Sequence, residues 1–190
     1  MFLSYILVLH MAISGNIGSG KSYIASELSD KMNIPRTSFS DSLKTYAKNN
    51  KMLTNRESLQ ELGSKLINGL SSEEFLELMK NNSSYNWDDD IIIDGFRHPS
   101  IFLKFKNMYP DTILIYCECK DTNKRVNRIS KRDDIKDRKI IYKIINHATE
   151  QEVDKLKNYS DIIIDTCDDN FDFDKDVLQK INAIQKAVSH

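Results

Sequence analysis

The sequence predicts an α/β protein built on a doubly wound parallel sheet of about five strands, flanked by helices. Short β-branched apolar runs alternate along the chain with longer segments of helical spacing. The isoleucine runs Ile91–Ile93 and Ile162–Ile164 are continuous, which is typical of strands covered on both faces of a parallel sheet. A glycine-rich motif joins the first strand to the first helix, in the order that such a sheet requires.

The first strand, expected over Tyr5–Ile13, leads into this motif, and Ser22–Met32 continues with helical spacing. The motif has the G-x-x-x-x-G-K-S pattern of the Walker A loop and reads Gly15-Asn16-Ile17-Gly18-Ser19-Gly20-Lys21-Ser22. Its glycines allow successive N–H groups to point at phosphate oxygens, and the helix N-terminus adds a positive dipole. The alternative, a chance glycine turn, is disfavoured by the complete motif in this context. We therefore expect all eight residues to bind ATP, with Lys21 reaching the β- and γ-phosphates and Ser22 ligating Mg²⁺.

Composition predicts a single domain over residues 1–190, with 40% hydrophobic and 29% charged residues. The net charge of −1 indicates neither nucleic acid nor a membrane surface as partner. The apolar start lacks the flanks of a signal peptide and is shorter than the ~20 residues of a bilayer span. Three cysteines without C-x-x-C spacing predict free thiols and a cytoplasmic location. Residues 1–10 could be an extension ahead of a start at Met11, and a homodimer stays open.

The first half of the chain continues with a short strand over Arg36–Ser40. Asp41 is placed to cap the helix that follows. Thr54–Lys80 is helical by pattern, with Gly63 and Gly69 expected as breaks.

The second half alternates in the same way, with a charged and interrupted segment at residues 132–143 that predicts a small, mobile helical lid. The other expected elements are a helix opened by Pro99, a strand over Thr112–Cys119, a helix capped by Asp121, a short helix over Thr149–Leu156, a strand over Asp161–Asp165 and a closing helix over Val177–Val188.

Three charged residues follow predicted strands, where ligands bind in open α/β sheets. Asp94 can hold Mg²⁺ directly or through water, and its alternative role is a helix cap. Arg97 can grip a phosphate, with a surface ion pair as an equal alternative. Asp41 can orient or deprotonate the attacking group, and a simple N-cap competes evenly.

Arginines 125, 128 and 132 share one helical face, within a stretch from Lys120 to Lys143 that carries ten basic and four acidic residues. A solvated helix face is the simple explanation. A basic flap over phosphorylated ligands would instead neutralise the charge of phosphoryl transfer and exclude water. We favour the flap because a phosphate loop is already present, with Arg132 and Arg138 as its working members and Arg128 near its hinge.

Four pieces of sequence carry a resemblance to a known family, namely Ile13–Ser22, Phe39–Lys44, Arg56–Gly63 and Ile93–Pro99. Together they resemble the nucleoside monophosphate kinases, and more narrowly the deoxynucleoside monophosphate kinases common among phage proteins. The resemblance implies a P-loop kinase fold in which residues 41–80 bind the acceptor. It also implies that Asp41, Lys44, Arg56 and Gln60 line the acceptor side. The family often has Asn-Glu after its proline, where this chain has Ser100-Ile101.

Other readings stay open. Dephosphocoenzyme A kinase shares the loop, an aspartate like Asp41 and the Arg128–Arg132 spacing, and a shikimate- or gluconate-type kinase ranks third. A non-catalytic nucleotide sensor is also compatible with the motif. A regulatory GTPase would need an Asn-Lys-x-Asp element, which the sequence lacks, and a motor ATPase would usually be longer and ring-forming.

The favoured hypothesis is transfer of the ATP γ-phosphoryl group to a (deoxy)nucleoside monophosphate, with Mg²⁺ as cofactor and small nucleotides as partners. The assigned residues are Lys21, Asp41, Asp94, Arg97 and Arg132 for catalysis, Gly15 to Ser22 with Arg128 for ATP, Asp41, Lys44, Arg56, Gln60, Arg97 and Arg138 for the acceptor, and Ser22 with Asp94 for the metal.

Overall fold

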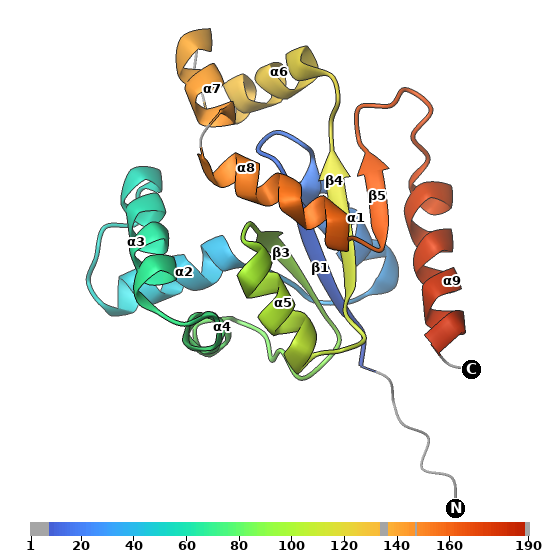
Figure 1. Cartoon of the computed structure of the whole chain (residues 1–190), viewed down its shortest axis with the longest axis horizontal. Coiled ribbons are helices and arrows are strands. Elements are labelled where there is room, and N and C mark those ends of the chain that lie inside the picture. The colour runs from blue at the N-terminus through green and yellow to red at the C-terminus, as the bar shows by residue number, and fades with distance from the viewer. Residues whose placement is uncertain (1–7, 134–136, 147, 189–190) are drawn as a thin grey trace, which may run out of the picture.

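A computed structural model describes residues 8–133, 137–146 and 148–188, and within these ranges five parallel strands form one sheet (Figure 1). The strands are β1 (His10–Gly15), β2 (Arg36–Ser38), β3 (Ile91–Phe96), β4 (Ile113–Glu118) and β5 (Ile162–Asp165). Their order is β2-β3-β1-β4-β5, with every pairing parallel. The predicted doubly wound parallel sheet is confirmed, and β1 at its centre places the glycine motif at the middle of the carboxyl edge.

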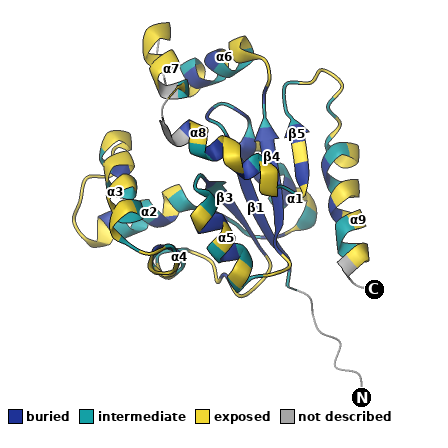
Figure 2. Cartoon of the chain, in the orientation of Figure 1, coloured by how far each residue is buried: buried dark blue, intermediate teal, exposed yellow. Residues whose placement is uncertain are grey.

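Helices cover both faces of this sheet (Figure 1). They are α1 (Lys21–Met32), α2 (Phe39–Asn49), α3 (Arg56–Gly69), α4 (Ser72–Asn81), α5 (Pro99–Met108), α6 (Thr122–Asp133), α7 (Arg138–Ile145), α8 (Ala148–Lys155) and α9 (Gln179–Val188), with a 3₁₀ turn at Leu156–Tyr159 and a π-helical turn at Asp174–Leu178. One face packs against α1 and α9, and the other packs against α4, α5 and α8. The burial colouring in Figure 2 shows the strands buried between these two layers.

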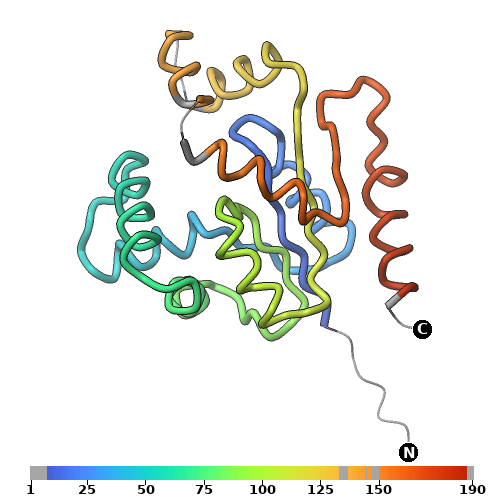
Figure 3. Tube along the Cα trace, viewed as in Figure 1, coloured from blue at the N-terminus to red at the C-terminus, as the bar shows by residue number. Residues whose placement is uncertain are grey.

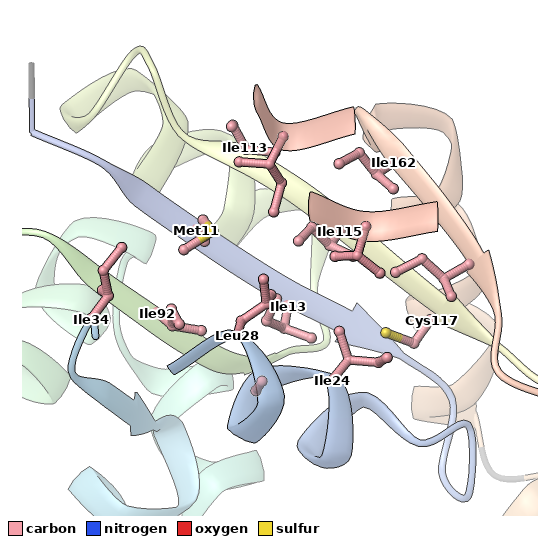
Figure 4. Packing of buried hydrophobic residues seen from close by; sticks show 14 of the residues in the cluster. Met11, Ile13, Ile24, Leu28, Ile34, Ile92, Ile113, Ile115, Cys117 and Ile162 are labelled. Atoms are coloured by element: carbon pink, nitrogen blue, oxygen red, sulfur yellow. The ribbon is translucent and has the colours of Figure 1, made fainter. Parts of the chain in front are cut away.

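The face under α1 and α9 is aliphatic (Figure 4). Met11 and Ile13 of β1 point to this side because alternate strand residues share a face. Ile24 and Leu28 lie one turn apart on α1 and bury their side chains completely against them. This packing fixes the direction in which α1 leaves the glycine loop.

The opposite face is aromatic. Phe96, at the end of β3, lies 4.8 Å from Phe39 and 5.2 Å from Phe105, measured between ring centroids. Trp87 contacts Phe105 edge to face at 5.9 Å. Edge-to-face and tilted pairs of this kind are favoured by the ring quadrupoles. They join α2 and α5 to the sheet edge where β3 ends.

The start of α2 differs from the expectation. Ser38 is the N-cap, and its hydroxyl oxygen accepts a hydrogen bond from the Asp41 backbone N–H at 3.1 Å. Asp41 lies in the first turn, where its carboxylate accepts the Ser38 hydroxyl proton at 2.7 Å. The prediction that Asp41 caps the helix was therefore wrong. Two polar residues three apart are both good cap candidates, and the strand ended earlier than its sequence suggested.

The predicted helical stretch over 54–80 is two helices. Gly63 lies inside α3, while Gly69 ends it, so only one of the two expected breaks is real. Ser71 and Glu74 then form a capping box that starts α4. Asp121 accepts the Lys124 backbone N–H at 3.0 Å, and Pro99 occupies the first turn of α5, so both of these predicted helix starts are confirmed.

The predicted lid coincides with the end of α6 and the start of α7, and residues 134–136 lie outside the described ranges. Tyr5, Ile6 and Leu7, expected in the first strand, also lie outside them. At the beginning of β1, the His10 ring stacks on Tyr109 at 4.2 Å, so this residue is part of the folded core. Within the described ranges, no helix is long and apolar enough to cross a membrane.

The cysteines divide into two kinds. Cys117 is free and buried in the sheet, as predicted, and its burial raises the pKa of the thiol. Cys119 and Cys167 form a disulfide with a Cα–Cα distance of 4.9 Å, so the prediction of free thiols was wrong for these two. They are 48 residues apart in sequence and meet because β4 and β5 are neighbours.

Replacing Phe105 by alanine should destabilise the protein by about 3–5 kcal/mol, because this ring is fully buried in the aromatic cluster. Leu103→Ala on the same helix is the control, since Leu103 is 44% exposed. Urea unfolding of both variants measures the two free energies. Equal losses would contradict the packing described for α5.

Candidate functional site

The loop after β1 has a backbone that only glycine adopts without strain. Gly15, Gly18 and Gly20 have φ values of 144°, 76° and 82°. A Cβ atom on Gly15 would lie 2.1 Å from the carbonyl oxygen of Cys117 on β4. The chain therefore turns immediately beside the neighbouring strand and enters α1 at Lys21, and the N–H groups of a first helical turn have no intrahelical partner and can bind an anion.

Lys21 follows the last glycine of the loop and is the first residue of α1. Its side chain is buried, and its ammonium group donates to the Asn16 carbonyl oxygen at 3.4 Å. Burial, together with the nearby charge of Arg97, lowers the pKa of Lys21 to about 8. A buried ammonium group whose described hydrogen bond is long gains stability when an anion binds beside it, so Lys21 favours binding of a phosphate.

Ser22 and Asp94 meet beside the lysine. The Ser22 hydroxyl donates to Asp94 Oδ2 at 2.8 Å, and Asp94 Oδ1 is buried with no hydrogen-bond partner among the described residues. Since His98 is the N-cap residue of α5, Asp94 does not serve as the helix cap considered from sequence. A hydroxyl oxygen next to an orphaned carboxylate oxygen fits the oxygen ligands that Mg²⁺ prefers.

Two arginines of α6 hold the outside of the loop. Arg128 donates to the Gly18 carbonyl oxygen at 3.3 Å and to the hydroxyl and carbonyl oxygens of Thr166 at 2.8 and 3.0 Å. The Thr166 hydroxyl in turn donates to the Ser19 carbonyl oxygen at 2.6 Å. Arg125 donates to the Ile17 carbonyl oxygen at 3.2 Å. These contacts fix the carbonyl groups of Ile17, Gly18 and Ser19, so this side of the loop is held to α6 and to Thr166.

A third contact comes from α8. Glu150 accepts the Ile17 backbone N–H at 2.7 Å and the Arg97 guanidinium N–H at 2.8 Å. The Cα trace in Figure 3 shows how the loop after β1 comes to lie beside α6 and α8. Sequence reasoning missed Glu150, because no local pattern links it to a loop 133 residues away. For Arg97 it had left two roles open, and this ion pair is one of them.

The sequence matches a known family over most of this architecture. Residues 11–154 match AAA_18, which is described as an AAA domain. The chain belongs to this family.

Solved structures resemble the AAA_18 chain along almost its whole length. A shikimate kinase from Aquifex aeolicus vf5 has a TM-score of 0.52 at 15% identity, covering 94% of this chain and 98% of that chain. A gluconokinase from Sinorhizobium meliloti 1021 has a TM-score of 0.53 at 9% identity, covering 95% and 94%. An uncharacterized protein from Eubacterium ventriosum ATCC 27560 reaches 0.58 at 16% identity, covering 94% and 98%. No curated protein matches the sequence. At such low identity the similarity shows the fold alone, and this fold is the P-loop kinase fold of the shikimate kinase and the gluconokinase.

The remaining predicted site residues lie on the helices around this centre. Asp41, Lys44, Arg56 and Gln60 have exposed side chains on α2 and α3, beyond the carboxyl end of β2. The described contacts of Asp41 are with Ser38 and Thr45. The structure therefore gathers the phosphate-loop residues with Asp94, Arg97 and Arg128. Asp41 lies near them, because its hydrogen-bond partner Ser38 pairs with Asp94 between β2 and β3. The acceptor roles of Asp41, Lys44, Arg56 and Gln60 stay predictions.

Two predicted lid residues are exposed. Arg132 lies one residue before the end of α6, and Arg138 begins α7. The charge of Arg132 makes a small contribution to the lowered pKa of Lys21. The lid roles of both arginines stay predictions.

Binding of a polyphosphate should be coupled to proton uptake by Lys21. The pKa of the free group is about 8, and an anion beside it should raise this value toward the ordinary 10.5. Between these two pH values the complex holds more protons than the free protein, so affinity should fall as pH rises. Titration calorimetry with ATP at about pH 8.5, in buffers of different ionisation enthalpy, measures this uptake.

Lys21→Arg is the matched variant, because arginine stays protonated throughout this range and should take up no proton. The wild type at about pH 6.5 should also take up almost none, since Lys21 is then already charged. Equal uptake by wild type and variant at the higher pH would show that another group titrates.

Proposed function

We propose that this protein is a kinase that transfers the γ-phosphoryl group of ATP to a (deoxy)nucleoside monophosphate. The observation that supports ATP as the phosphoryl donor is the loop itself, which places the buried Lys21 at the N-terminus of α1. The P-loop kinase fold supports the same class of reaction. The family description names no reaction, so the acceptor rests on the resemblance to nucleoside monophosphate kinases.

Each residue of the donor site has a role that its position supports. Lys21 would neutralise the β- and γ-phosphates, and the loop N–H groups would hold their oxygens. Ser22 and Asp94 would hold Mg²⁺, which when bound supplies charge neutralisation across the phosphates. Arg128 would keep the loop in its binding geometry through Gly18 and Thr166. These contributions are positioning and electrostatics, the two effects that dominate phosphoryl transfer.

The acceptor half rests on Arg97 and on the surface of α2 and α3. Arg97 lies beside the loop, bonded to Glu150, and its planar guanidinium could bind the acceptor phosphate through two N–H groups. Lys44, Arg56 and Gln60 would then face the nucleotide. Ile101, which stands where the family often has an acid, is buried against the core and so offers no polar contact. Recognition of the base must therefore use other side chains.

A small-molecule kinase is the second candidate, because a shikimate kinase and a gluconokinase share the fold over nearly the whole chain. Dephosphocoenzyme A kinase and a non-catalytic nucleotide sensor also stay as alternatives. Small nucleotides as partners, without nucleic acid or membrane, and a cytoplasmic location are part of the proposal. The disulfide between Cys119 and Cys167 weighs against that location, because disulfides are rare in reducing compartments.

An acceptor panel tests the proposal. The four common deoxynucleoside monophosphates, modified deoxynucleotides, dephosphocoenzyme A, shikimate and gluconate are each incubated with ATP and Mg²⁺, and ADP release is measured. We expect at least one monophosphate to raise ADP release about tenfold or more. Release stimulated by a hydroxy acid alone would favour the second candidate, and no stimulation by any acceptor would favour the sensor.

Lys21→Ala is the control for this panel. Loss of a charge that stabilises the transition state should lower turnover by about 100-fold or more, which is about 3 kcal/mol. Undiminished turnover in this variant would remove the loop from the reaction, whichever acceptor is used.

A further inference from the structure

Glu150 is a buried acid that the proposed reaction does not use. Only 5% of the residue is exposed, although it lies on the short helix α8 beside the phosphate loop. One carboxylate oxygen accepts the Ile17 backbone N–H at 2.7 Å, and the other accepts an Arg97 N–H at 2.8 Å. The Asn16 side-chain amide also donates to the Glu150 carbonyl oxygen at 3.2 Å, which ties α8 to the loop.

These two donors are of the kinds that a phosphoryl oxygen takes, namely a loop N–H and a guanidinium. The carboxylate therefore sits where an anionic group of a ligand would be bound between the loop and Arg97. A phosphoryl group and a carboxylate cannot share these donors, because two like charges so close repel strongly in a buried site.

We propose that Glu150 occupies the position of the transferred phosphoryl group in the nucleotide-free protein and leaves it when a triphosphate binds. The proposal deepens the proposed kinase function and rests on it. The proposal assigns these two donors to the γ-phosphate, so Glu150 makes the site respond to that group. ATP binding must displace the carboxylate, and ADP binding need not.

The structure has a place for the displaced carboxylate. A cavity of about 350 Å³ adjoins the loop, and it is lined by Asn16, Arg125, Ile145, Asn146, Glu150, Gln151 and Asp154. Within it, Nη2 of Arg125 is buried and has no hydrogen-bond partner among the described residues. A guanidinium N–H left without an acceptor can take a carboxylate that swings away from Ile17.

Displacement would also release Arg97. Its guanidinium is paired with Glu150 at 2.8 Å, so its charge is neutralised and the side chain is held against α8. Once Glu150 leaves, Arg97 can bind a second phosphate. Donor binding therefore prepares the acceptor side, and we expect the acceptor to bind more tightly to the ATP-loaded protein than to the free one.

The test compares binding of ADP with that of a non-hydrolysable ATP analogue, by calorimetry with Mg²⁺ and no acceptor. Glu150→Gln keeps the shape of the side chain and removes its charge. This variant should bind the ATP analogue about tenfold more tightly than the wild type, with ADP affinity changed by less than about twofold. Glu150→Ala, which removes both hydrogen bonds, should also raise the affinity for the ATP analogue relative to that for ADP.

Asp154→Asn is the matched control, because it removes a charge from the same cavity while Asp154 contacts Tyr116 and not the loop. Its ratio of analogue to ADP affinity should equal that of the wild type. An unchanged ratio in both Glu150 variants, or weaker analogue binding in them, would overturn the proposal. Because no acceptor is present, a failed acceptor panel would refute the proposed function without altering this result.

Discussion

The close approach of the main chain at Gly15 to β4 is the constraint on which the rest of the site depends. No side chain fits between this residue and the Cys117 carbonyl group, so the loop can turn directly at the carboxyl edge of the sheet. That turn starts α1 beside the end of β3, which brings Ser22 to Asp94. The aliphatic packing of α1 against the sheet then fixes the direction of the helix, so the residues at its N-terminus are held in place by the core.

The site is an arrangement of charges whose balance depends on a ligand. Burial, and after it the nearby charge of Arg97, lowers the pKa of Lys21. The charges of Asp94 and Glu150 act in the opposite direction. A polyphosphate would bring further negative charge into this site, and we propose that one of these carboxylates then moves. Glu150, on a short helix attached through hydrogen bonds to the loop, is the member best placed to move.

The features that could be predicted from the sequence are those that depend on residues close together in the chain. The loop, the strand that precedes it and Asp94 at the end of β3 are local patterns, and the sheet brings them together in any fold of this class. Ser38 and Asp41 are both residue types that favour the N-cap position, so local propensity does not show which of them caps α2. Glu150 and the disulfide depend on chain segments that meet only after folding, so no local pattern marked them. The contacts of Arg128 with Gly18 and Thr166 could not be predicted for the same reason, since these residues are far apart in the sequence.

The most direct test of this account follows the backbone amides of the loop by nuclear magnetic resonance while ATP and Mg²⁺ are added. The backbone amide protons of Gly18, Gly20, Lys21 and Ser22 should show the largest downfield shifts, because they would donate to phosphate oxygens. Saturating nucleotide that shifts resonances elsewhere and leaves these amides unchanged would contradict it.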